Sequence, residues 1–135
     1  MTTLAFYCGP GRWRDAVIRQ ATGSIYSHCE IVNPDGECIS ASKRDGNRVR
    51  QKPISFKAGH WSFLTTHHDA AETWARAEAL LGAPYDTWGA LIGGGLGVPY
   101  HIRPDAWYCN EMICHCLCLP QPWPAHPGAL WGALT

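Results

Sequence analysis

The apolar positions of this chain follow two different spacings, one typical of β-strands and one typical of α-helices. Short segments in which apolar and polar residues alternate between turn-forming residues predict strands. The predicted strands are residues 3–7, 27–32, 37–42, 48–56 and 61–65. The tetrapeptide Asn33-Pro34-Asp35-Gly36 between the second and third strands is made of turn formers, so we expect a β-hairpin there.

Apolar residues spaced three or four apart predict helices between and after these strands. The predicted helices are residues 12–21, 69–81, 86–92 and 108–119. In the first of them Trp13, Ala16 and Val17 share one face. The second begins with Asp69 and Glu72 in the spacing of a capping box, which makes it the clearest helix of the chain.

Two segments are predicted to lack regular structure. Residues 93–97 are almost all glycine, and prolines recur after residue 119. The order of the elements predicts an α+β fold in which a small antiparallel sheet packs against helices. No repeat or linker interrupts the pattern, so we expect a single domain over residues 1–135.

Composition narrows the range of functions. The 11 basic residues balance 11 acidic residues, so the formal net charge is zero and the electrostatic footprint of a nucleic-acid-binding protein is missing. Hydrophobic residues make up 46% of the chain, enough for a core, but no apolar run reaches the roughly 18 residues of a transmembrane helix. We therefore expect neither a nucleic-acid partner nor a membrane span.

The chain contains seven cysteines, an odd number and a density below that of disulfide scaffolds. Its first residues lack the basic start and apolar run of a secretory signal, so we expect synthesis in the cytoplasm and reduced thiols. Cys114, Cys116 and Cys118 are spaced two apart on a predicted helix, where such side chains diverge by about 200°. They cannot close on one ion, and we expect no metal and no other cofactor.

Two local patterns could carry chemistry. In the predicted strand 27–32, side chains alternate between faces, so His28 and Glu30 share one face while Cys29 lies on the other. Cys109 falls in the first turn of the apolar helix 108–119. Backbone amides at a helix start favour a thiolate, and a nearby imidazole would complete an activated nucleophile.

These patterns resemble those of the circularly permuted papain-like hydrolases, the NlpC-type superfamily of cell-wall peptidases and amidases, and especially its YiiX/YaeF-like branch. The matching segments are Ser27-His28-Cys29-Glu30-Ile31-Val32 and Tyr108-Cys109-Asn110-Glu111, with the histidine first and the cysteine last. Residues 5–7, 9–11, 40–46, 82–86 and 127–130 are similar to the small versions found in tailed phages and prophages. The resemblance covers nearly the whole chain.

The resemblance implies a permuted papain-like fold in which Cys109 is the nucleophile and His28 the base. It also implies a polar residue that orients the histidine, usually from the neighbouring strand. Here that strand offers Ser40 and Ser42 instead of an acid, whereas Glu30 shares the face of His28. We favour Glu30 as the orienting residue and keep the two serines as alternatives. The resemblance further suggests Tyr7 as a side chain that helps to bind the oxyanion.

The function implied by the resemblance is hydrolysis of amide bonds through an acyl-enzyme, without a cofactor. The implied substrates are peptidoglycan stem peptides or related small amides. Two alternatives stay open: a lipid-directed thioesterase or acyltransferase, and a phage virion or assembly component that retains the fold without turnover. A wall enzyme without a secretory signal would leave the cell by lysis or be carried in a phage particle.

Overall fold

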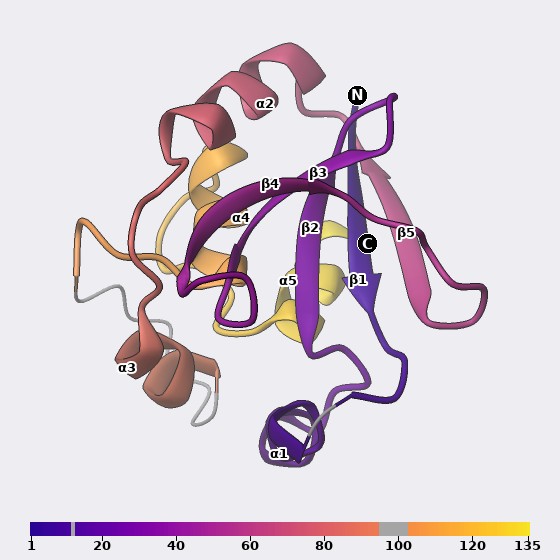
Figure 1. The fold of residues 1–135 in the computed structure, drawn as a ribbon, viewed down its shortest axis with the longest axis vertical. Helices are drawn as coiled ribbons and strands as arrows, with labels where there is room; N and C mark the ends of the chain where they lie inside the picture. Colours follow the sequence, from indigo (N-terminus) through magenta and orange to yellow (C-terminus); the bar gives the residue numbers. More distant parts are fainter. Residues whose placement is uncertain (12, 95–102) are drawn as a thin grey trace.

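A computed structural model describes residues 1–11, 13–94 and 103–135. Its centre is a five-stranded antiparallel sheet with the strand order β4-β3-β2-β1-β5 (Figure 1). The strands are β1 Thr2–Tyr7, β2 His28–Val32, β3 Glu37–Ser42, β4 Arg48–Pro53 and β5 Trp61–Thr66. All five strands predicted from the alternation of apolar and polar residues are thereby confirmed, with β4 ending before residue 56.

The hairpin predicted between β2 and β3 is confirmed. The side-chain oxygen of Asn33 accepts hydrogen bonds from the backbone N–H groups of Asp35 and Glu37, both at 3.0 Å. Gly36 has a φ of 84°, a conformation that residues with a Cβ rarely adopt. This turn fixes the register of β2 against β3, which pairs Ile31 with Ile39. On its other side β2 pairs with β1, and there His28, the first residue of β2, lies opposite Tyr7.

The helical elements are α1 Trp13–Thr22, α2 Ala70–Ala79, α3 Thr87–Gly89, the π-helical turn η1 Ala90–Gly94, α4 Cys109–Cys116 and α5 Pro127–Leu134. Asp69 caps α2 as predicted, because its carboxylate accepts from the N–H of Glu72 at 2.8 Å. The predicted loop 93–97 is partly corrected by η1, which extends through Gly94; its remaining residues lie outside the described chain. None of the described helices is both long and apolar enough to cross a bilayer.

The prediction of an irregular C-terminal tail is wrong, because it contains α5. Pro127 occupies the first turn of this helix, where its missing N–H costs no hydrogen bond. The ring of His126 caps the helix by accepting from the N–H of Ala129 at 3.2 Å. A proline at this position starts a helix, whereas the recurrence of proline alone predicts its absence.

The helices α2, α4 and α5 cover one face of the sheet, and α4 and α5 lie behind it in Figure 1. The core between sheet and helices is built from fully buried apolar side chains: Leu4, Phe6, Cys29, Ile31, Ile39, Met112, Ile113 and Leu130. The helix α4 packs over β2 and β3. This packing brings the first residue of α4 close to the first residue of β2.

Candidate active site

The structure brings His28 and Cys109 together at the start of β2 and the start of α4. The two side chains are close enough that charge and hydrogen-bonding interactions between them shift both pKa values. Tyr108 precedes α4 with an extended backbone and offers no side-chain cap, so no capping side chain occupies the helix start. Its hydroxyl donates to the carbonyl of Ala125 at 2.9 Å, which anchors this end of the helix. The residue Cys109 is 6% exposed, and the side chain of His28 is 23% exposed.

The pKa values of the two groups move in opposite directions. The pKa of Cys109 is lowered, first by a hydrogen bond from the thiol of Cys29 and then, against the effect of burial, by the charge of His28. Burial lowers the pKa of His28, but the charges of Cys109 and Glu30 and hydrogen bonds to both raise it further than burial lowers it. Both shifts favour a thiolate on Cys109 beside an imidazolium on His28.

Glu30 contacts His28 as the alternation of β2 predicts, with 2.7 Å between His28 Nε2 and Glu30 Oε1. The carboxylate is fully buried and receives two bonds from Arg50, 2.6 Å to Oε1 and 2.8 Å to Oε2. Burial alone would raise the pKa of Glu30, but the bonds from Arg50 and the charge of His28 lower it, so Glu30 is ionised. Because Nε2 is engaged with Glu30, Nδ1 is the nitrogen left to exchange a proton with Cys109.

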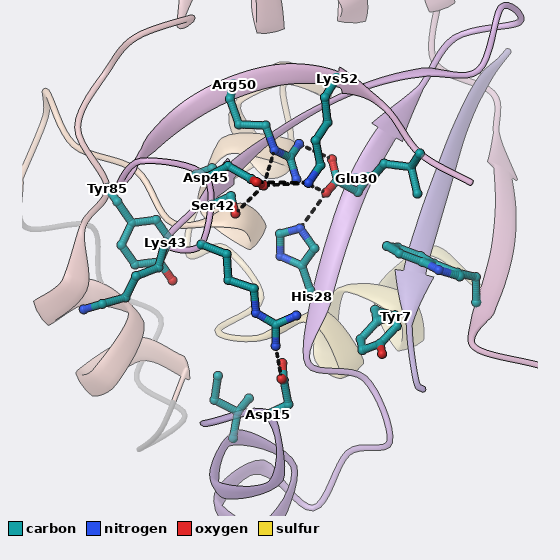
Figure 2. Close-up of a pocket in the computed structure, with 15 residues that line it drawn as sticks. Tyr7, Asp15, His28, Glu30, Ser42, Lys43, Asp45, Arg50, Lys52 and Tyr85 are labelled. Atoms are coloured by element: carbon teal, nitrogen blue, oxygen red, sulfur yellow. Dashed lines mark hydrogen bonds and ion pairs between the residues drawn. The ribbon is translucent and has the colours of Figure 1, made fainter. Parts of the chain in front are cut away.

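Arg50 also contacts a second carboxylate, Asp45, so its guanidinium lies between Glu30 and Asp45 (Figure 2). Arg50 Nε donates to Asp45 at 2.8 Å, and Lys52 and Ser42 also donate to it, each at 3.0 Å. Burial would raise the pKa of Asp45, but these three hydrogen bonds lower it. Hydrogen-bonded charged groups thus connect Asp45, through Arg50 and Glu30, to His28.

Arg50 and Asp45 were not among the residues singled out from the sequence. One signal in the sequence points to such a partner, since a buried carboxylate needs a cation to pair with and the predicted strand 48–56 contains Arg48, Arg50 and Lys52. Arg50 lies opposite Ser40 on β3, and alternation along β4 puts Arg50 and Lys52 on the same face. The missing information was the register of β4, which the sequence pattern alone does not fix.

The three hydroxyl groups proposed from the sequence are engaged elsewhere. Ser40 donates to the carbonyl of Cys29 at 2.7 Å, and Ser42 donates to Asp45. Tyr7 lines the cavity beside His28, but its hydroxyl donates to the carbonyl of Pro10. A phenol has one proton to donate, so this arrangement does not offer Tyr7 as an oxyanion donor. The backbone N–H groups at the start of α4 are better placed for that role.

A cavity of about 280 Å³ opens on the sheet face that carries Glu30 and Arg50 (Figure 2). Its lining combines charged side chains with aromatic and aliphatic ones, and most of it comes from the strands, from α1 and from the loop between β3 and β4. His28 lines this cavity, whereas Cys109 does not. A substrate carbonyl group in the cavity can therefore reach the Cys109 sulfur only past the side chains around His28.

Comparisons with known proteins support the fold. No family model matches the chain, and no curated protein sequence matches it. Among solved structures it is similar to the crystal structure of metalloprotein YiiX from Escherichia coli O157:H7, with a TM-score of 0.58 and 17% sequence identity. The match covers 85% of this chain and 62% of YiiX, so the chain spans less than two thirds of the length of that protein.

YiiX is described as a metalloprotein, which raises the question of whether the present side chains would suit a metal ion. In the parts of the chain that the structure describes, no group of three or more His, Cys, Asp or Glu residues is arranged to hold one. What the likeness to YiiX shows is the fold, a YiiX-like α+β arrangement of a small antiparallel sheet and helices.

Proposed function

We propose that this protein is a cysteine hydrolase of the permuted papain-like type that cleaves amide bonds through an acyl-enzyme on Cys109. The observation that supports this most directly is the contact of Cys109 with His28, whose ring is held by Glu30. A nucleophile at a helix start, a base within hydrogen-bond reach and a third group that orients the base form the arrangement that covalent catalysis needs.

The proposed reaction has two steps. The Cys109 sulfur attacks the carbonyl carbon, and backbone N–H groups at the start of α4 bind the developing oxyanion. The imidazolium of His28 gives its proton to the leaving amine, which departs and leaves a thioester. Water then attacks this thioester while His28 takes its proton, and the thiolate leaves. Glu30 keeps the ring in place throughout and stabilises its charged form.

The proposed substrates are peptidoglycan stem peptides or related small amides. The cavity beside His28 is lined by both charged and aromatic side chains, which suits a peptide better than a purely apolar chain. To reach peptidoglycan, an enzyme made in the cytoplasm would be released by cell lysis or carried in a phage particle, and this route is part of the proposal.

A second candidate, a lipid-directed thioesterase or acyltransferase, is favoured by a separate observation. The predicted apolar face of α1 points outward, with Trp13 75% and Val17 55% exposed, and Trp88 on α3 is 68% exposed. The helix α1 lies beyond the end of the sheet at which β2 begins, and it contributes Asp15 to the cavity lining (Figure 1). Exposed apolar side chains around a reactive site suit an amphiphilic substrate.

The experiment that tests the proposal is covalent trapping followed by turnover. The wild type is treated with a thiol-directed electrophilic amide probe, and the labelled residue is identified by mass spectrometry. Cys109→Ala should abolish labelling, His28→Ala should slow it strongly, and Cys118→Ala, which removes an exposed thiol, serves as the control. Turnover of muropeptides against acyl thioesters then separates the two enzyme candidates. A folded wild type that neither labels at Cys109 nor turns over either substrate would leave only the non-enzymatic role.

A further inference from the structure

The charges that line the cavity are not balanced. Among the described residues that line it, four cationic side chains accompany three carboxylates, and His28 adds a further positive charge when it is protonated. Glu30 and Asp45 are both engaged by the buried Arg50, and Lys52 also binds Asp45. The remaining carboxylate, Asp15, is paired with Arg44, whereas Lys43 forms no ion pair with a described carboxylate. Such an excess of positive charge attracts anionic ligands.

Arg44 and Asp15 form an ion pair across the opening of the cavity. Arg44 comes from the loop between β3 and β4, and Asp15 comes from the first turn of α1. The Asp15 side chain is 11% exposed, whereas the Arg44 side chain is 42% exposed. Only one nitrogen of the guanidinium donates to Asp15, so other donors of this planar group remain open to the solvent at the opening.

The Asp15 carboxylate lies close to the backbone of Gly11. A Cβ added at Gly11 would lie 2.1 Å from Asp15 Oδ2, so this close approach requires glycine. The neighbouring cation behaves differently, since Lys43 donates only to the hydroxyl of Thr87 at 3.4 Å and forms no ion pair with a described carboxylate. The site therefore contains a carboxylate already placed on an accessible arginine, next to a second cation without an acidic partner.

We propose that Arg44 recognises a carboxylate group of the substrate, and that Asp15 occupies this carboxylate position while the site is empty. The inference rests on the proposed hydrolase function and narrows its substrates to amides that carry a carboxylate near the scissile bond. The geometry points to a carboxylate because the group that Arg44 binds at rest is one, and a planar guanidinium matches its shape. The substrate carboxylate and Asp15 therefore compete for Arg44. When the substrate displaces Asp15, the ion pair that links the β3-β4 loop to α1 is broken.

Two matched chromogenic substrates test this inference: succinyl-alanyl 4-nitroanilide, which carries a carboxylate, and succinamoyl-alanyl 4-nitroanilide, in which a carboxamide replaces it. The measured quantity is the ratio of kcat/KM for the first over the second. Arg44→Gln should lower this ratio by about 10- to 100-fold, the range of a charge-assisted hydrogen bond. Asp15→Asn should raise it, because the competing carboxylate is gone. Arg48→Gln, an exposed cation outside the cavity lining, should keep the wild-type ratio.

Equilibrium binding separates this inference from the proposed function. Cys109→Ala, with and without Arg44→Gln, is titrated by NMR with succinyl-alanine amide and with its succinamoyl counterpart. Preference for the carboxylate that disappears with Arg44→Gln supports the anion site even if the wild type cleaves neither anilide, in which case the hydrolase proposal fails alone. Equal binding of the two probes, or a kcat/KM ratio that Arg44→Gln leaves unchanged, overturns the assignment of Arg44.

Discussion

Replacing Glu30 with glutamine tests the centre of the proposed site. Glu30 Oε1 accepts from both His28 and Arg50, and Oε2 accepts from Arg50 alone. A glutamine with its oxygen at the Oε1 position keeps two of these three contacts, but its NH₂ group then faces an N–H donor of Arg50. The reversed orientation loses two contacts, so the first is preferred. Glu30→Gln therefore keeps the shape of the site and removes its charge.

The expected cost follows from these contacts. One buried hydrogen bond is replaced by two opposed donors, which costs about 1–3 kcal/mol of unfolding free energy. Removing one partner of a buried ion pair costs about 3–5 kcal/mol, but Arg50 keeps Asp45, so this range is an upper limit. The pKa of His28 should fall, because the adjacent negative charge that raises it is gone. Turnover should fall by about 10²- to 10⁴-fold, the contribution of a correctly held acid–base group.

Three measurements check this prediction side by side: urea denaturation for stability, NMR titration of the His28 ring, and the rate of Cys109 alkylation across pH. Ser40→Ala and Ser42→Ala are the matched controls, since each removes a hydroxyl from the neighbouring strand and leaves the charge on Glu30 intact. An unchanged His28 titration and normal alkylation in Glu30→Gln, together with a loss in a serine variant, would refute the role of Glu30.

Three further predictions concern the cysteines and a buried acid. Limiting iodoacetamide should label Cys109 before any other thiol, and its rate should rise through a pKa below the ordinary thiol value of 9.0; equal labelling of several cysteines would contradict this. Chelator and reductant together should leave the melting temperature nearly unchanged in differential scanning fluorimetry, whereas a drop of tens of degrees would reveal a structural metal or disulfide. Burial and the charge of Asp86 raise the pKa of Glu111 to about 8, so ionisation opposes folding as pH rises from about 4.5 to about 8. The stability of Glu111→Gln relative to the wild type should therefore increase as the pH rises from about 4.5 to about 8. A difference in urea midpoint between the variant and the wild type that is the same at both pH values would contradict the shift.

Local pattern was sufficient for several parts of the site. Alternation along β2 predicts that His28 and Glu30 share a face, and their 2.7 Å contact agrees with it. The apolar spacing after Tyr108 predicts a helix that begins near Cys109, which the structure confirms. Both inferences depend only on neighbours within one element, where the period of the backbone fixes the relative direction of side chains.

Other parts depend on contacts between distant segments, and these the sequence left open. Arg50 reaches Glu30 across β3, so its role depends on the registers of two strand pairs at once. The thiol of Cys29, assigned to the opposite face from His28, nevertheless lowers the pKa of Cys109, because α4 begins near the start of β2. The sequence pattern also does not predict that the apolar face of α1 is exposed, since amphipathic spacing groups the apolar residues on one face without showing what that face contacts.

The two turns of the β2-β3-β4 meander impose unequal constraints on chain length. The turn at residues 33–36 follows Val32, at the opposite end of β2 from His28, and its central residues are exposed. The loop at residues 43–47 has Arg44 at the cavity opening and Asp45 against Arg50. Insertions between homologous chains should therefore accumulate in the first turn and be absent from the second. For the same reason a peptide tag or fluorophore attached at residues 34–35 leaves the site accessible, whereas one residue added between 43 and 47 shifts both charged groups together.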